Sequence, residues 1–566
     1  MTAGQAASRG GWIPVLDWLS SYRGEWLRPD VLAALTVWAL VVPQGIAYAQ
    51  IAGLPPQAGL FATIAGLVGY ALLGTSRQLM VSPTSSTAAI SGALVATVAV
   101  GDATRIPALA AALAGLAGAA LVVFGLLRMG FLSRFIAAGV QTGFMFGLGL
   151  TIVVGQLPKL LGTPDVSLDV VRGVGGIVPF LGEIHVPTLA LGLASLAAIL
   201  VLRRFAPRIP GALVVVVAAV ALVSILDLAS RGVAVLGTIE GGVPLPVIPD
   251  VGIADLVALL PGALILAVIL YAEGITVAER FAETHRYDIR PDQELIAAGG
   301  GNLLSGLFGG FIVGGGASQS AAGDRSGGQT QLVSLLVAGL VLVTVVALLP
   351  LFTNLPQAVL GAIVISAVLG FLDVAALRRL AELRRDSFAL ALVALGGVVV
   401  LGVVPGLLLA VAISIGLILV AFSRPSGSRM GRLPGTDTFV AVEHEPTAAT
   451  DAGVLVYRLN APMLTLNAKH LRDLIRHEMD ASASTPSVVE LDMTFSSDLD
   501  VGTIDALETL HRELSERGIA LELGNVRGEV AAMLERSGLS DKVGRERIHR
   551  DLATLTADDS DRSGPA

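Results

Sequence analysis

A run of three glycines interrupts the apolar stretch FIVGGGASQSAAG, residues 311–323. Glycine permits an extended approach, so the spacing predicts a short helix that begins near Ser318. The first N–H groups of such a helix have no partner within it, and the helix dipole places about half a positive charge at that end. Helix ends of this kind attract anions. The pattern therefore indicates an anion site where this helix begins.

A second interrupted segment, GTSRQLMVSPTSSTAAISGAL at residues 74–94, repeats the design in the first half of the chain. An extended QLMVS run meets Pro83, and a helix is expected to begin within the hydroxyl-rich residues 84–87, which can cap its free N–H groups. The two breaks fall at corresponding positions of two halves, a pattern typical of the central site of a secondary transporter. The alternative is that glycine and serine only allow close helix packing.

Three more polar side chains lie inside apolar segments. Gln44 follows Pro43, and Tyr48 lies one turn further along the same helix face. Glu273 is the only acidic residue in LILAVILYAEGITVA, where a charge costs about 2.5–3.5 kcal/mol on membrane insertion. We expect Glu273 to face a cavity and to carry a proton or pair with a cation. The alternative is a hydrogen bond within the helix bundle.

The elements that must position these residues are membrane helices. The 566-residue chain is 54% hydrophobic and 14% charged, whereas soluble proteins are about 25% charged. Apolar runs such as residues 108–127 reach the roughly 20 residues that cross a hydrocarbon core, and about fourteen segments of this kind are expected between residues 31 and 424. We predict an all-α polytopic membrane domain. Arginines concentrate in every second loop, which predicts that both termini are cytoplasmic.

The residue types and motifs of the chain do not predict an enzyme. The chain has no cysteine, and its seven histidines lie outside the apolar segments. It contains neither a nucleophile elbow nor a Walker-type loop, so we expect no enzyme, no metal site and no ATP-driven pump. Asp324 and Arg325 are expected to pair at the inner end of the second broken helix, and Asn302 to make a packing hydrogen bond.

The composition changes after Arg424. Short β-like runs then alternate with amphipathic helical stretches, which predicts a small α/β domain, cytoplasmic by continuity with the last span. The predicted organisation is an N-terminal cytoplasmic or interfacial segment at 1–30, a membrane domain at 31–424, a linker at 425–436, the α/β domain at 437–558 and a disordered tail at 559–566.

Nearly the whole chain resembles the sulfate permease (SulP) family of anion transporters. PPQAGLFATIAGLVGYALLGTSRQ (55–78) resembles the family signature, PQGIAYAQIAGLPP (43–56) its first span, and GNLLSGLFGGFIVGGGASQSAAGDRSGGQTQL (301–332) its ninth and tenth spans. The C-terminal domain is similar to the STAS domains of these proteins. The resemblance implies a fold of about fourteen spans in a seven-plus-seven inverted repeat. It also implies core and gate domains, half-helices in spans three and ten, and a homodimer.

The resemblance also implies which side chains contact the substrate. In the family, the substrate lies between the N-terminal ends of spans three and ten, beside spans one and eight. The matching substrate-binding positions are Gln44, Tyr48, Ser85, Ser86, Ser318 and Gln319, with Glu273 as the ion-coupling position.

Two positions depart from the family pattern. Many members carry an arginine where this chain has Gln319, which weakens the case for a divalent anion such as sulfate. Bicarbonate carriers of the family also lack that arginine, and they use an acid of span eight to hold sodium, as Glu273 could. In the STAS domain, Gly502 stands in the place of a phosphorylatable serine, with Thr503 beside it, so a scaffold role is favoured over a phosphoswitch.

We therefore predict a secondary-active transporter of a small inorganic anion, sulfate or bicarbonate among them, in the plasma (inner) membrane. It is expected to work by alternating access, with membrane lipid around it and no nucleic-acid partner. No cofactor is expected beyond a coupled proton or sodium ion. The alternatives are a nucleobase–proton symporter of the same fold and a sensor that binds an anion without transporting it.

Overall fold

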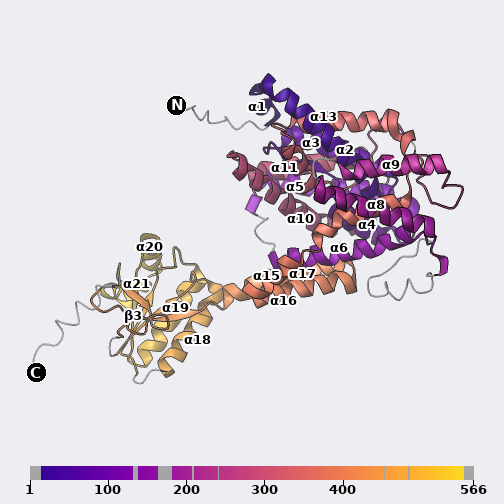
Figure 1. Ribbon diagram of the computed structural model, residues 1–566. Helices are drawn as coiled ribbons and strands as arrows, with labels where there is room; N and C mark the ends of the chain where they lie inside the picture. Colours follow the sequence, from indigo (N-terminus) through magenta and orange to yellow (C-terminus); the bar gives the residue numbers. More distant parts are fainter. Residues whose placement is uncertain are drawn as a thin grey trace, which may run out of the picture. The chain divides into compact units, whose positions relative to one another are not determined.

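The computed structural model describes residues 14–131, 138–163, 182–206, 210–239, 241–436, 438–450, 453–481 and 485–552. The predicted tail at 559–566 lies outside these residues. The chain divides into two compact units, Met1–Ser414 and Ile415–Ala566, the first of them helical (Figure 1).

The helices of the first unit follow the apolar segments predicted from the sequence. Eight helices of the described residues are long and apolar enough to cross a membrane, and shorter apolar helices accompany them. The number of membrane spans stays a prediction. The helices that begin in the first unit are α1 (Pro14–Ser20), α2 (Leu27–Ile51), α3 (Pro56–Leu73), α4 (Ser85–Ala99), α5 (Ile106–Leu126), α6 (Ala138–Leu161), α8 (Val186–Phe205), α9 (Gly211–Leu226), α10 (Ile253–His285), α11 (Pro291–Leu307), α12 (Ala317–Arg325), α13 (Leu332–Val343), α14 (Gln357–Val368), α15 (Val374–Leu383), α16 (Arg385–Leu401) and α17 (Val403–Ser423).

Two short strands bring the interrupted segments together. β1 (Val81–Ser82) pairs antiparallel with β2 (Gly314–Gly315), and α4 and α12 begin just beyond them. Gly315 has to be glycine, because a Cβ there would lie 2.6 Å from the Cα of Gly274 in α10. The predicted extended approaches and half-helices are confirmed, and the glycines allow the close approach to α10.

The GTSR segment, residues 74–77, is hydrogen-bonded to the start of α11. The carboxylate of Glu294, which is 3% exposed, accepts hydrogen bonds from the backbone N–H of Thr75 at 2.7 Å and from its hydroxyl at 2.6 Å. The hydroxyl of Tyr70 donates to the same carboxylate. A buried carboxylate needs such donors because burying it unpaired is costly. This part of the family signature therefore serves the fold.

The GGQTQL segment, residues 327–332, follows α12 and makes similar hydrogen bonds. The carboxylate of Asp30 in α2 accepts from the N–H of Gln329 and from the hydroxyl of Thr330, both at 2.7 Å. The side-chain amide of Gln331 donates to the backbone oxygens of Ser76 and Leu79, at 2.8 and 2.7 Å. These bonds fix α12 against α2 and against the segment that leads to β1.

Two local predictions had different outcomes. Asn302 donates to the backbone oxygen of Val313 at 2.9 Å and accepts from its N–H at 3.0 Å, so its packing role is confirmed. The predicted pair of Asp324 with Arg325 is wrong: Asp324 instead contacts His285 of α10 at 2.7 Å. Arg325 donates to a carbonyl of its own helix. Neighbouring residues of a helix do not face each other, which is why the adjacent pair does not form.

The second unit is an α/β domain, as predicted. Its five-stranded sheet has the order β4-β3-β5-β6-β7, antiparallel from β4 to β5 and parallel from β5 to β7. Buried leucines, isoleucines and methionines join the sheet to its helices. The elements are β3 (Gly427–Arg432), β4 (Phe439–Ala441), β5 (Val454–Leu459), α18 (Thr465–Ala481), β6 (Val488–Asp492), α19 (Val501–Glu516), β7 (Ala520–Gly524), α20 (Gly528–Arg536) and α21 (Leu539–Val543).

The start of α19 offers no exposed hydroxyl for a phosphoswitch. Asp500 caps the helix by accepting from the N–H groups of Thr503 at 2.8 Å and Thr465 at 3.0 Å. Burial raises the pKa of Asp500, but these donors outweigh burial and lower the pKa to about 2. A Cβ on Gly502 would overlap the side chain of Thr465, and Thr503 is 1% exposed. This packing favours the scaffold role.

Three carboxyl groups gather on strands β6 and β7. Glu490 is 1% exposed and lies opposite Glu522 in the parallel ladder, with Asp492 two residues along the same strand. Burial, together with the charges of Glu522 and Asp492, raises the pKa of Glu490 to about 8 from an ordinary value of 4.5. The folded domain therefore keeps a proton on Glu490 that the unfolded chain releases at lower pH.

This proton makes the stability of the domain depend on pH. The stability should be greatest below about pH 4.5 and fall until the folded carboxyl ionises near pH 8, because unfolding releases the proton in between. Glu490→Gln should remove most of this dependence and stabilise the domain at pH 8 by at least about 2 kcal/mol, since each pKa unit corresponds to about 1.4 kcal/mol. Hydrogen-exchange protection of β6 and β7 in the full-length protein, corrected for intrinsic rates, measures the effect.

The exposed Glu535 of α20 provides the control. Glu535→Gln should change protection by less than about 0.5 kcal/mol. Identical pH profiles for Glu490→Gln and the unmodified protein would contradict a protonated Glu490.

Candidate functional site

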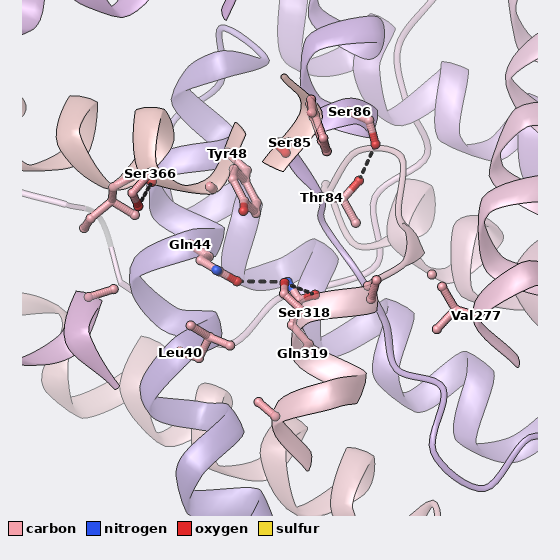
Figure 2. Close-up of a pocket in the computed structure, with 18 of the residues that line it drawn as sticks. Leu40, Gln44, Tyr48, Thr84, Ser85, Ser86, Val277, Ser318, Gln319 and Ser366 are labelled. Atoms are coloured by element: carbon pink, nitrogen blue, oxygen red, sulfur yellow. Dashed lines mark hydrogen bonds between the residues drawn. The ribbon is translucent and has the colours of Figure 1, made fainter. Parts of the chain in front are cut away.

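A cavity of about 700 Å³ opens inside the helical unit, where the paired strands end (Figure 2). Its lining residues come from α2, α4, α6, α8, α9, α10, α12 and α14. The structure brings every predicted site residue to this cavity: Gln44, Tyr48, Ser85, Ser86, Glu273, Ser318 and Gln319 all line it.

The α12 end of the cavity carries free backbone donors. Its first residues, Ala317 and Ser318, are exposed and line the cavity, and the N–H of Ser320 donates to the oxygen of Gly316 at 2.9 Å as a helical bond. No side chain caps this end. The N–H of Gly316 donates to the oxygen of Met80 at 2.8 Å, so the N–H groups of Ala317, Ser318 and Gln319 are the ones that can bind a negative group.

The α4 end is built differently. The hydroxyl of Thr84 accepts from the N–H of Thr87 at 3.2 Å, while the hydroxyl of Thr87 accepts from the N–H of Thr84 at 3.0 Å. This reciprocal capping box satisfies one donor within the helix and leaves Ser85 and Ser86 at the cavity. The two helix ends are thus unequal, with α12 the less satisfied.

Glu273 of α10 links the α4 end to the cavity. One of its carboxylate oxygens accepts from the hydroxyl of Ser86 at 3.2 Å. The other oxygen, Oε1, is buried and has no hydrogen-bond partner. A carboxyl group with an unused oxygen in a cavity can hold a proton or an additional cation.

Gln44 and Gln319 form a neutral bridge between α2 and α12. The side-chain nitrogen of Gln319 donates to the side-chain oxygen of Gln44 at 2.9 Å, and the hydroxyl of Ser318 donates to the side-chain oxygen of Gln319 at 3.1 Å (Figure 2). Tyr48 lies one turn beyond Gln44 on α2 and faces the same space.

The sequence reasoning missed several residues that line the cavity. Arg203 of α8 and Arg325 of α12 are exposed there and are, with Glu273, its charged lining residues. Arg203 is one of the arginines from which the sequence predicts the cytoplasmic loops, and nothing local shows that α8 and α12 line the same cavity. The other missed polar residues are Thr36, Thr84, Gln141, Thr276 and Ser366.

Comparisons with known proteins agree with this architecture. The Sulfate permease family matches residues 27–394, and the STAS domain matches residues 445–555. A probable sulfate transporter of Mycobacterium tuberculosis is 38% identical over 547 residues, covering 96% of this chain and 97% of that protein. Sulfate transporter 3.1 of Arabidopsis thaliana is 30% identical over 564 residues, covering 94% and 85%.

Solved structures share the fold. The murine Slc26a9 anion transporter superposes with a TM-score of 0.89 at 24% identity, covering 99% of this chain and 96% of that one. The transmembrane domain of the cyanobacterial bicarbonate transporter BicA gives a TM-score of 0.60 at 23% identity, covering 69% and 98%. The family match spans well over half of the chain, and the M. tuberculosis relative spans nearly all of it. The chain therefore belongs to the sulfate permease family, a family of membrane transporters rather than enzymes, and carries a C-terminal STAS domain.

Proposed function

We propose that this protein carries a small inorganic anion across the membrane by alternating access, with the anion held between the N-terminal ends of α4 and α12. The observation that carries the proposal is the β1–β2 pairing, which starts both helices at one cavity. Helix N-termini in a partly dehydrated space attract negative charge without requiring a buried lysine. Glu273 is proposed to couple a proton or sodium ion to the anion.

The identity of the anion depends on the charge of the cavity. The relatives named as sulfate transporters favour sulfate, while the neutral Gln319 favours a monovalent anion such as bicarbonate. Uptake of labelled sulfate, bicarbonate and chloride into proteoliposomes, with and without sodium and pH gradients, tests both the transport and the choice. Uptake of none of them would overturn the proposed function.

The nucleobase–proton alternative requires side-chain amides that are free to pair with a base. Gln44 and Gln319 are bonded to each other at 2.9 Å, so a base would have to replace that bond, whereas an anion can also use the backbone donors of α12. Uracil and xanthine should therefore fail to compete with the transported anion. An anion sensor would bind its ligand and show no flux in the same assay.

The setting of the transporter belongs to the same proposal. We expect a homodimer surrounded by lipid in the plasma membrane, with both termini and the STAS domain on the cytoplasmic side. The alternation of arginine-rich loops supports this orientation. Cleavage of the STAS domain in inside-out vesicles but not in intact cells would test the orientation, and the mass of the purified protein would test the dimer.

Arg203 and Arg325 should attract the anion into the cavity. Replacing both with glutamine is expected to raise KM by about 3- to 10-fold and to weaken its dependence on ionic strength, because exposed charges act mainly on encounter and are screened by salt. Initial uptake rates between low and physiological salt measure this. Lysine at both positions keeps the positive charge, so it should bring KM and its dependence on ionic strength most of the way back to those of the unmodified protein. An unchanged salt dependence in the double glutamine variant would contradict the attraction.

A further inference from the structure

The side chain of Gln319 folds back over the start of its own helix. Gln319 is the third residue of α12 and is 2% exposed. A Cβ placed on Gly316 would overlap the side-chain oxygen of Gln319 and lie 2.8 Å from its Cδ atom. The carboxamide therefore occupies the space in which a capping side chain of residue 316 would otherwise lie.

The orientation of the carboxamide follows from its neighbours. The hydroxyl of Ser318 donates to the oxygen of Gln319 at 3.1 Å, and that oxygen lies beside Gly316 at the start of the helix. Its nitrogen is directed to Gln44, which is 7% exposed and holds it at 2.9 Å. The partly negative oxygen thus rests at the positive end of the helix dipole. This is the part of the cavity in which the transported anion is proposed to bind.

An empty anion site creates a problem that this arrangement solves. Uncapped N–H groups that leave water without a partner are costly. A carrier that returns empty has to move such a site through a closed state. The carboxamide oxygen of Gln319, which lies over the start of α12, places a partly negative atom at these donors when the anion is absent.

We propose that Gln319 is a built-in occupant of the anion site, which the anion displaces on binding and which allows the empty carrier to reorient. This inference rests on the proposed function and deepens it. The bonds of Gln319 to Ser318 and Gln44 must break when the anion enters, so Gln319 lowers the affinity. In return, net uptake becomes possible without an anion on the return step.

Gln319→Ala distinguishes a side chain that the anion displaces from a side chain that binds the anion directly. For the anion that the unmodified protein binds best among sulfate, bicarbonate and chloride, this variant should lower Kd about tenfold, equivalent to about 1.4 kcal/mol. Net uptake should slow relative to anion–anion exchange, because the empty site can no longer reorient easily. Calorimetric titration of the purified full-length protein gives Kd, and proteoliposomes give the two fluxes.

Gln319→Glu provides the second variant. Its carboxylate would occupy the site with a full negative charge, so anion binding should weaken by at least about tenfold. Gln329→Ala removes an exposed carboxamide outside the cavity and keeps the backbone N–H that donates to Asp30, so it should leave Kd within about twofold.

The outcomes distinguish the inference from the proposed function. A tenfold weaker Kd in Gln319→Ala, with net uptake and exchange reduced together, would show an ordinary ligand and overturn the inference while leaving the anion site intact. If the unmodified protein bound none of the three anions, the proposed function would fail first, and the inference with it.

Discussion

Replacing Ser318 with proline is expected to abolish high-affinity anion binding and uptake. Proline has no N–H, so Ser318→Pro removes a backbone donor from the α12 end of the cavity. A hydrogen bond to a charged group contributes about 1.5–3 kcal/mol. The loss of this donor alone therefore predicts a Kd about 10- to 150-fold weaker. Calorimetric titration and initial uptake rates measure the loss.

Two further variants distinguish the loss of the backbone N–H from the loss of the Ser318 hydroxyl and from a disturbance of the helix. Ser318→Ala keeps the N–H and loses only the hydroxyl, so it should retain binding within about fivefold. Ala317→Pro removes the preceding donor at the first helical position, where proline is tolerated. Gly316 is already extended there, with φ −78° and ψ 94°, as a residue before proline must be. Unchanged affinity in both proline variants would refute the helix-end site.

The sequence predicted the broken helices because their signals are local. Glycines 314–316 and the hydroxyl run at 84–87 mark two helix starts, whatever surrounds them. The sequence alone could not show that the two extended approaches pair as β1 and β2, since more than two hundred residues separate them. That pairing brings together the side chains that the resemblance to the family implied as substrate-binding positions.

Contacts between distant segments also explain what the sequence reasoning missed. Asp324 contacts His285, which lies 39 residues away, rather than the adjacent Arg325. The Gln44–Gln319 bond joins residues 275 apart, and no local pattern predicts that these two side chains contact each other. Helical periodicity specifies the face on which a residue lies, and it does not specify the partner that the fold places opposite that face.

The unequal ends of α4 and α12 suggest a division of labour within the cavity. No side-chain cap bonds the donors at the start of α12, whereas Thr84 caps α4 internally. Ser86 of α4 instead donates to Glu273. The α12 end is thus the better suited to the anion, and the carboxyl group of Glu273 beside Ser86 is the proposed place of a coupled cation, so that each can be altered separately.

Replacing Glu273 with glutamine should uncouple transport from its driving gradient. An anion and an ionised Glu273 in one cavity repel each other, and a proton or sodium ion on the carboxyl removes that repulsion. Anion and cation should therefore favour each other's binding. Glutamine keeps the shape and the ability to accept from Ser86, but it carries no charge. Gradient-driven uptake should fall by about 5- to 150-fold, the range of a coupling free energy of about 1–3 kcal/mol.

Anion exchange without a gradient should persist in the Glu273→Gln variant within about threefold, because the α12 end is untouched. Glu279→Gln makes the same change on an exposed face of α10 and should leave both modes unaltered. Proteoliposomes loaded with unlabelled anion measure exchange, and empty ones under a pH or sodium gradient measure uptake. A coupling role predicts selective loss of the second mode; equal loss of both modes, or of neither, would assign Glu273 to the packing of α10 against α4 instead.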